Sequence, residues 1–152
     1  MTPGRRELQF RTLDEIMPEV DRLMASGYTT LGRWDLARTC NHLSSSMVWA
    51  MEGFPVQIPW IVRMTIGKLI KKQILSSGKM KEGVKIPESM TPQPDLDDRA
   101  EAEALRAAIR LFQDNPTKRA PSPIFGVMTN EENDLLQRIH AAHHLSFLIP
   151  KS

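Results

Sequence analysis

The stretch 129–145 reads TNEENDLLQRIHAAHHL and has the pattern of an amphipathic helix with a defined start. Thr129, followed three residues later by Glu132, forms a capping box, which is typical of a helix N-terminus. At about 100° per residue, a set of charged side chains lies on the arc opposite His140: Glu131, Asp134 and Arg138. Since charged side chains face solvent, His140 is expected to face the protein interior. We predict a helix over residues 130–149.

Similar periodic patterns along the chain predict a helical protein. Aromatic residues make up only 6% of the sequence and apolar–polar alternation is scarce, so there is little material for a sheet. The predicted long helices cover residues 12–26, 34–53, 97–114 and 130–149. Helices of this length can form a four-helix bundle, with the apolar, basic segment 59–76 in a long crossover between the second and third helices. The predicted fold class is all-α, in one domain over residues 1–152.

Local signals place the starts of two further helices. Thr12 and Glu15 form a capping-box pattern at the start of the first helix. Pro18 lies inside this helix, so we expect it to kink the helix or delay its start. Asp97 or Asp98 is expected to cap the third long helix.

Size, charge and cysteine content exclude several classes of protein. At 152 residues and 17.3 kDa, the chain has the size of one ordinary domain. Its 20 Lys and Arg against 18 Asp and Glu give a formal charge of +2, which is too balanced for a dedicated nucleic-acid binder. One cysteine cannot form an internal disulfide, the sequence lacks the ~20 consecutive apolar residues of a membrane span, and the first residues are polar. We therefore expect a cytoplasmic protein with no nucleic-acid or membrane partner.

The histidines are the main candidates for a functional site. His140 and His144 are four residues apart on the last predicted helix, a spacing at which two imidazoles can bind the same metal ion. His143 lies about 60° from His140 on the other side, so its spacing ranks it second without excluding it. His42 lies in the middle of the second predicted helix, on a stripe that is unusually polar for a buried face. The stripe consists of Asp35, Arg38, Ser45, Ser46 and Trp49.

The chemistry of imidazole favours a metal site if three histidines converge. Three neutral imidazoles supply nitrogen donors for a divalent transition metal such as zinc or nickel and leave a position open for water or a substrate atom. We therefore predict His42, His140 and His144 as metal ligands. Possible outer-sphere or pocket residues are His143, Asp35, Ser45, Ser46 and Trp49. A single mid-helix histidine is more often partly exposed or hydrogen-bonded, so this alternative stays open for His42.

Two other groups of reactive side chains have simpler interpretations. Cys40 lies about 160° from His42 on the helical wheel, and a buried free cysteine packs like a small apolar residue. The serines at 44–46 have no identifiable acid–base partner, and helical serines commonly bond to their own backbone. We expect structural roles for both.

A run of lysines follows the second predicted helix and is a candidate surface for an anionic partner. It comprises Lys68, Lys71, Lys72, Lys79, Lys81 and Lys85. Ile70, Ile74 and Leu75 lie among these lysines and can supply an ordinary inner face. The pattern favours a solvated basic face over a binding surface.

Three blocks of sequence together resemble a known superfamily. The first is 34–43, WDLARTCNHL, and the second is 51–55, MEGFP. The third runs from 125 to 145 and ends in HAAHHL. Over about residues 8–149 the chain resembles the DinB-like (YfiT-type) metal-binding four-helix bundles, in particular an uncharacterised bacterial branch.

The resemblance implies a function as well as a fold. It implies one metal ion bound by a histidine of the second helix and two of the last, here His42, His140 and His144. The superfamily includes thiol S-transferases that use low-molecular-weight thiols, and dimers are frequent in it. The expected function is a metal-dependent enzyme of thiol S-transferase or hydrolase type, acting as a homodimer on a small molecule. The alternative is a non-catalytic metal-binding or structural dimer.

Overall fold

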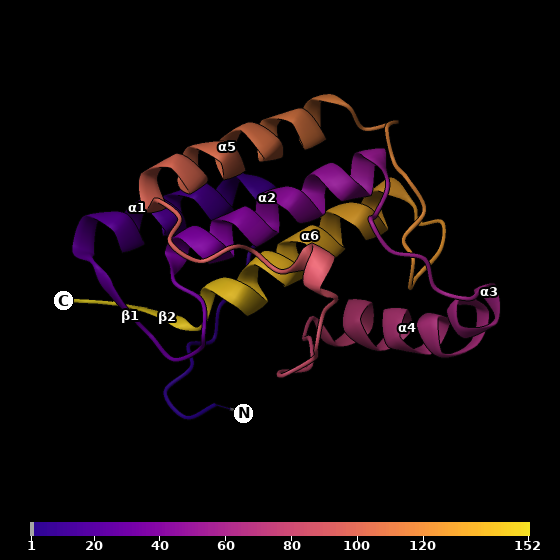
Figure 1. Cartoon of the computed structure of the whole chain (residues 1–152), viewed down its shortest axis with the longest axis horizontal. Coiled ribbons are helices and arrows are strands. Elements are labelled where there is room, and N and C mark those ends of the chain that lie inside the picture. Colours follow the sequence, from indigo (N-terminus) through magenta and orange to yellow (C-terminus); the bar gives the residue numbers. More distant parts are fainter. Residues whose placement is uncertain (1) are drawn as a thin grey trace.

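The computed structural model describes residues 2–152 and shows a mostly helical protein (Figure 1). The longer helices are α1 (Ile16–Ser26), α2 (Leu36–Glu52), α4 (Lys68–Ser77), α5 (Asp98–Asp114) and α6 (Asn130–Leu145). The shorter elements are the 3-10 turns Leu13–Glu15 and Glu88–Met90, the helix α3 (Trp60–Val62), the π-helical stretch Arg63–Gly67, and the strands β1 (Tyr28–Thr30) and β2 (Leu148–Pro150). The prediction of a predominantly helical chain is confirmed.

The apolar core lies between α1, α2, α5 and α6. α2 packs against both α5 and α6, while α1 contacts α5 and α6 (Figure 1). Large, fully buried side chains come from each of these helices: Ile16, Leu23, Leu43, Met47, Leu105, Phe112 and Leu145. Full burial of a side chain of this size contributes about 1.5–3 kcal/mol. The core therefore holds α2 and α6, the two helices that carry the histidines, in a fixed relation.

Two short strands, which the sequence analysis did not predict, join the segment after α1 to the C-terminal segment. α6 ends at Leu145 rather than near residue 149, and β2 pairs antiparallel with β1, with Thr29 opposite Ile149. Leu148 is fully buried in the extended segment, and Pro150 lacks the N–H that a continuing helix needs. The protein is therefore mostly helical with a small two-stranded sheet, which is compatible with the predicted all-α class.

The capping box predicted for the first helix is wrong. The Thr12 side chain makes no cap hydrogen bond; instead, Glu15 Oε2 accepts a hydrogen bond from the Arg11 N–H at 2.7 Å. A 3-10 turn comes first, and α1 begins at Ile16. Pro18 then lies in the first turn, where a backbone N–H has no helical partner in any case. The expected delay of the helix start is therefore confirmed.

Three other helix starts carry capping side chains. The capping box of α6 is confirmed: the Glu132 N–H donates to Thr129 Oγ1 at 3.1 Å, and the Thr129 N–H donates to Glu132 Oε1 at 3.0 Å. Of the two candidates at α5, Asp97 is the cap, and it accepts from the backbone of the first turn at 2.8 Å. Asp35 caps α2 in the same way, also at 2.8 Å. Each carboxylate satisfies a backbone donor that the helix leaves free.

Asp98 instead joins the starts of α2 and α5 to β1. The Tyr28 hydroxyl donates to Asp98 Oδ2 at 2.9 Å and accepts from the Leu36 N–H at 2.9 Å. The Ala37 N–H donates to Asp98 Oδ1 at 2.8 Å. Burial, opposed by the Leu36 N–H and reinforced by Asp98, raises the pKa of Tyr28 to about 12. This network fixes the first turn of α2, ahead of His42.

The segment after α2 forms an arm, defined here as residues 60–77, which contains α3, the π-helical stretch and α4. It ends at Gly78, whose φ of 69° favours glycine. Ile74 is buried as predicted, but Ile70 is 40% exposed, so the inner face of the arm is narrower than predicted. Within residues 2–152, none of the helices is long and apolar enough to cross a membrane.

Candidate metal centre

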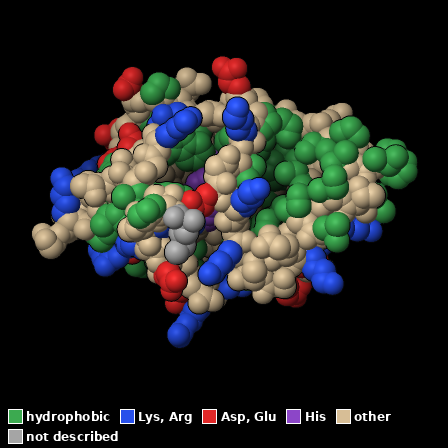
Figure 2. Space-filling view, turned by 90° about the horizontal axis from the view of Figure 1, so that it is seen from below, with side chains coloured by type: hydrophobic (Ala, Val, Ile, Leu, Met, Phe, Trp, Pro, Cys, Tyr) green, Lys and Arg blue, Asp and Glu red, His purple; other side chains and the backbone are tan. Residues whose placement is uncertain are grey.

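His42 on α2 converges with His140 and His144 on α6. Nε2 of His140 lies 3.1 Å from Nε2 of His42 and 3.0 Å from Nε2 of His144. His42 is buried and the other two are half-buried. Figure 2 shows histidine side chains at the bottom of a hollow in the surface. The structure therefore brings together the three histidines that the sequence nominated, close enough to hold a metal ion.

The arrangement of ring nitrogens suits a cation better than three imidazoles alone. A neutral imidazole nitrogen offers either one proton or one lone pair in the ring plane, so Nε2 of His140 cannot bond well to both neighbours. A cation at the common point accepts a lone pair from each ring. Around a tetrahedral zinc ion with Zn–N distances of about 2.0–2.1 Å, the nitrogens lie about 3.3 Å apart, close to the two distances from His140 Nε2 to its neighbours. The donor set therefore fits a divalent transition metal.

Protein side chains fill only part of a metal coordination sphere at this point. Within residues 2–152, the group consists of the three histidines, with no carboxylate or thiol among them. Structural zinc sites have four protein ligands, whereas catalytic sites have three and keep one position for water or substrate. This group has the composition of a site that leaves a position open.

Burial keeps all three imidazoles neutral. It lowers the pKa of His42 to about 4, and the backbone of Met90 opposes this shift only in part. Burial, followed by the proximity of the other imidazoles, holds the pKa of His140 and of His144 well below the ordinary value. At neutral pH each ring therefore has a lone pair available for a metal ion.

An indole ring packs against the histidines, and the sequence analysis did not identify it as a site residue. Trp34, just before α2, stacks on His144 with ring centroids 5.2 Å apart and an interplanar angle of 18°. It also lies 4.9 Å from the His42 ring. Trp34 therefore contacts a ring from each helix and restricts their rotation. The only sign of Trp34 in the sequence was its place in WDL at the start of the second predicted helix, which does not show where the indole ring points.

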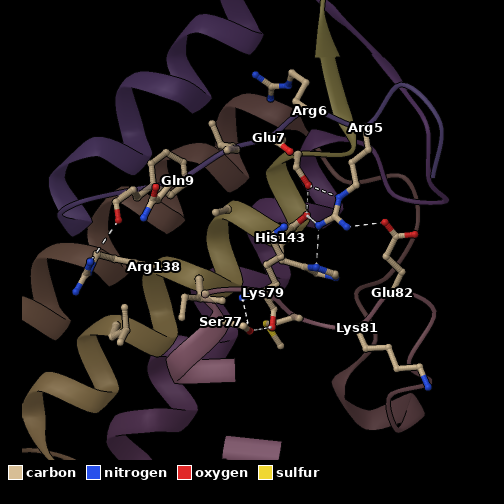
Figure 3. Close-up of a pocket in the computed structure, with 18 residues that line it drawn as sticks. Arg5, Arg6, Glu7, Gln9, Ser77, Lys79, Lys81, Glu82, Arg138 and His143 are labelled. Atoms are coloured by element: carbon tan, nitrogen blue, oxygen red, sulfur yellow. Dashed lines mark hydrogen bonds and ion pairs between the residues drawn. The ribbon is translucent and has the colours of Figure 1, made fainter. Parts of the chain in front are cut away.

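His143 lies outside the three-histidine group. Its Nδ1 is 2.9 Å from the guanidinium of Arg5, which also donates to Ser146 Oγ at 2.7 Å and pairs with Glu82 (Figure 3). The ring contacts His144 edge to face, with centroids 5.0 Å apart. Burial and the positive charge of Arg5 lower the pKa of His143 to about 4. His143 is thus a neighbour of the group, in the secondary position that its spacing indicated.

A cavity of about 780 Å³ lies on the His143 side of α6. Residues 5–10, the loop at 77–82 and α6 line it (Figure 3). Hydrogen bonds from the Thr2 hydroxyl and the Arg5 guanidinium lower the pKa of Glu82 to about 2, so this carboxylate is ionised and ties the N-terminal segment to the loop. The volume lies within the range of small-molecule sites, about 300–1,000 Å³.

The remaining residues predicted for the pocket belong mainly to α2 and its packing. Asp35 is the N-cap of α2, and Ser46 Oγ donates to a backbone carbonyl of the same helix at 2.7 Å. Trp49 packs against Phe54, with ring centroids 6.1 Å apart. Ser45 is half-buried on α2. The capping role of Asp35 was not predicted, whereas Ser46 bonds to its own helix as expected for the serines at 44–46.

Cys40 and Ser44 have the structural roles that we expected. Cys40 is fully buried, and burial raises the pKa of its thiol, so it is protonated at neutral pH. Ser44 Oγ donates to the Asn41 carbonyl of its own helix at 3.0 Å. Neither side chain is available as a nucleophile.

A family model described as "Protein of unknown function" (DUF1569) matches residues 3–151 of the chain. Searches of the curated proteins and of the solved structures found no match. The predicted membership of the DinB-like superfamily is therefore corrected, because that resemblance depended on three short blocks, whereas the family model spans nearly the whole chain. The chain belongs to the DUF1569 family of proteins of unknown function.

Proposed function

We propose that the protein is a metal-dependent enzyme of hydrolase or thiol-transferase type. In this proposal His42, His140 and His144 hold a divalent transition metal ion, zinc or nickel. The observation that supports it is the convergence of three neutral imidazole nitrogens with no fourth side-chain ligand in the described part of the chain, residues 2–152. A bound ion of this kind supplies Lewis acidity to an oxygen or sulfur atom.

The chain's own contribution is to hold the three ligands in place before the ion binds. We infer that α1, α2, α5 and α6 form a four-helix bundle, with the arm in the crossover between α2 and α5. The shared core of these helices supports this inference. Ligands held on rigid, packed helices keep their positions better than ligands on loops. Trp34 adds to this by stacking on the His144 ring.

A small molecule is the substrate class that best fits the surroundings of the histidines. The cavity of about 780 Å³ has a volume suited to such a ligand, and it borders the centre through His143, whereas the three ligand histidines do not line it. A low-molecular-weight thiol is the first candidate nucleophile, because thiolate is a good ligand for zinc. Water is the second, and it corresponds to hydrolysis.

Metal analysis of the native protein tests the site. Protein purified without a metal-affinity step is expected to carry about one transition metal ion per chain, measured by inductively coupled plasma mass spectrometry. His140→Ala removes a central ligand and is expected to lose this metal. His143→Ala is the matched control, because His143 lies on the same helix but outside the group, and it is expected to keep the metal. Unchanged metal content in His140→Ala would show that the site is wrongly assigned.

Catalysis needs a separate measurement. The metal-loaded and chelator-stripped proteins are assayed with panels of hydrolysis and thiol-transfer substrates. Turnover that depends on the metal and disappears in His140→Ala supports the proposal. X-ray absorption spectroscopy of the loaded protein is expected to show a ligand that exchanges with solvent or thiol. A fourth, non-exchanging protein ligand would indicate a structural site and contradict catalysis.

A further inference from the structure

The arm exposes a large share of its apolar side chains. Of residues 60–77, only Gly67 and Ile74 are buried. The most exposed large apolar side chains of the arm are Trp60 (65%), Ile61 (58%), Met64 (50%), Ile66 (56%) and Leu69 (70%). Figure 2 shows hydrophobic side chains gathered at the right of the molecule, where the arm lies. Single exposed apolar residues are ordinary, but contiguous groups mark interaction surfaces.

This apolar surface continues onto the loop between α5 and α6. Ile124 and Val127 of that loop are 38% and 82% exposed. Gly67 packs so closely against the Ile124 carbonyl that a Cβ at this position would collide with the oxygen. The missing side chain at Gly67 lets the loop lie directly on the arm. Residues 60–70 and 124–127 therefore form one surface, called the docking face below.

A groove of about 600 Å³ lies within the docking face and at its edge. Its apolar lining includes Met64, Leu75, Phe125 and Val127, and its basic lining is Arg63, Lys68, Lys71 and Lys72. Lys71 is neutralised by Glu132, with Nζ 2.7 Å from the carboxylate. Within residues 2–152, the other three basic side chains of the groove form no ion pair. Apolar and cationic groups thus lie side by side.

The distribution of charge along the sequence sets this segment apart from the rest of the protein. Residues 53–81 contain six Lys and Arg and no Asp or Glu. The rest of the chain has 14 Lys and Arg against 18 Asp and Glu. A basic segment on an otherwise acidic protein attracts an anionic partner. The small net charge of the whole chain conceals this asymmetry.

We propose that the docking face binds to the surface of an anionic phospholipid bilayer. In a helix that lies in the membrane interface, apolar side chains enter the boundary between headgroups and acyl chains, while lysines stay at the level of the phosphates. Trp60 at the start of the arm suits this depth, because tryptophan is favoured at membrane interfaces. Such a helix lies on the bilayer without spanning it. The proposal replaces our expectation of no membrane partner, and it does not depend on the metal centre.

The same features argue against two other occupants. A second copy of the chain would bring two basic segments together, each with six positive charges. A nucleic acid would neutralise the lysines but leave Trp60 and Leu69 exposed to water. A bilayer with anionic headgroups satisfies both the apolar and the basic side chains.

Vesicle sedimentation with the full-length protein tests the proposal. The protein is mixed with vesicles of phosphatidylcholine alone or of phosphatidylcholine with phosphatidylglycerol. We expect binding to the anionic vesicles, little binding to the neutral ones, and a decrease in binding as added salt screens the charges. Trp60 is expected to enter a less polar environment, seen as a blue shift of tryptophan emission.

The apolar contribution is tested by the double substitution Trp60→Gln/Leu69→Gln. It removes two of the most exposed apolar side chains, so we expect binding to anionic vesicles to fall more than tenfold. Leu111→Gln is the matched control, because Leu111 is 49% exposed on α5, outside the docking face. The Leu111→Gln protein is expected to bind anionic vesicles as well as the wild type does. Circular dichroism establishes that each variant is folded.

The basic contribution is tested by Lys68→Gln and Lys72→Gln, which leave the apolar side chains in place. Each is expected to weaken binding about fivefold, since a basic residue near an anionic surface contributes about 1 kcal/mol. Arg99→Gln and Arg110→Gln remove equal charges from exposed positions on α5 and are expected to have little effect.

Three results would overturn the proposal. One is that the protein sediments equally with neutral and anionic vesicles, or that it sediments with neither kind. Another is unchanged binding in both the double apolar variant and the two lysine variants. The last is a wild-type protein that is a dimer by light scattering and does not bind vesicles, together with a monomeric Trp60→Gln/Leu69→Gln variant. In that case a second copy of the chain would cover the docking face.

Discussion

The metal centre and the arm depart from the usual distribution of side chains in opposite directions. At the centre, His42 is buried and His140 and His144 are half-buried, so three titratable rings share one place with little access to water. On the arm, Trp60 and Leu69 are 65% and 70% exposed, although large apolar side chains are mostly buried. Each arrangement costs solvation free energy, and each lies where the proposed function requires it.

The two regions differ in how firmly the rest of the protein holds them. At the centre, His42 follows the anchored first turn of α2, its neighbour Leu43 is in the core, and Trp34 packs on its ring. The arm is attached chiefly at Gly67 and Ile74 and through the ion pair between Lys71 and Glu132. The effect of a substitution on folding should therefore decrease from the centre to the arm.

The largest effect is expected for Leu43→Ala. Leu43 is 1% exposed and follows His42 in α2, so its truncation leaves a cavity in the core beside the metal centre. We expect a loss of about 2–5 kcal/mol in the free energy of unfolding. Urea denaturation followed by circular dichroism measures it. A loss below about 1 kcal/mol would mean that the centre is less tightly packed than the structure indicates.

Acid should destabilise the metal-free protein through its buried imidazoles. The pKa of His42 is about 4 in the folded protein, against an ordinary value of 6.5, so the unfolded chain binds its proton first as the pH falls. The contribution of His42 to the free energy of unfolding is constant above pH 6.5 and is lost as the pH falls to 4. The loss over that window is about 3 kcal/mol.

Urea denaturation of chelator-treated wild type and His42→Gln across this pH window follows the contribution of His42 and its coupling to His140 and His144, because titrating groups away from the centre affect both proteins equally. Between pH 6.5 and pH 4, the free energy of unfolding of the wild type should fall by about 3 kcal/mol relative to that of His42→Gln. A difference that does not change with pH would contradict the buried, neutral state of His42.

An intermediate effect is expected where the arm meets the rest of the protein. Gly67 has helical dihedral angles, φ −58° and ψ −42°, at which alanine normally favours a helix by about 1 kcal/mol. Here the added Cβ collides with the Ile124 carbonyl, so Gly67→Ala should instead destabilise the protein by about 1–3 kcal/mol. Lys68→Ala, at the next and exposed position, is the control and should be close to neutral. A stabilised Gly67→Ala protein would show that the loop does not lie on the arm.

Features that depend on local chemistry could be predicted from the sequence. α2 and α5 lie close to their predicted bounds, because the Asp35 and Asp97 caps act within one turn. Helical periodicity also predicted that His140 and His144 share a face that is turned inward, because their spacing is a property of the helix alone.

The features that could not be predicted from the sequence depend on contacts between residues far apart in the chain. The pairing of β1 with β2 and the stacking of Trp34 on His144 join segments separated by more than 100 residues. Ile70 has the spacing of a core residue, but periodicity does not show whether another element covers it. Thr12 has the spacing of a cap, yet Glu15 bonds to a different backbone donor.

A smaller effect is expected for Trp34→Leu. Leucine keeps an apolar side chain beside the histidines but removes the stacked ring, and aromatic pairs of this kind contribute about 0.5–1.5 kcal/mol. We expect a loss of that size in the free energy of unfolding, measured by urea denaturation with circular dichroism. A similar Trp49→Leu substitution should leave the His144 ring in place, which nuclear magnetic resonance of the imidazole signals can follow. Identical imidazole signals in Trp34→Leu and wild type would contradict a positioning role for Trp34.

The smallest effect is expected for Leu69→Gln on the arm. Leu69 is 70% exposed, and glutamine has a similar helix propensity, so the free energy of unfolding should change by less than about 0.5 kcal/mol. The result is informative because Leu43→Ala and Leu69→Gln each remove a leucine, one of which is surrounded by the core and the other by solvent. A loss above about 1 kcal/mol would mean that Leu69 is covered in solution by this protein or by a second copy. In that case the arm would belong to the folded core, and the docking face would have no free apolar surface to offer a bilayer.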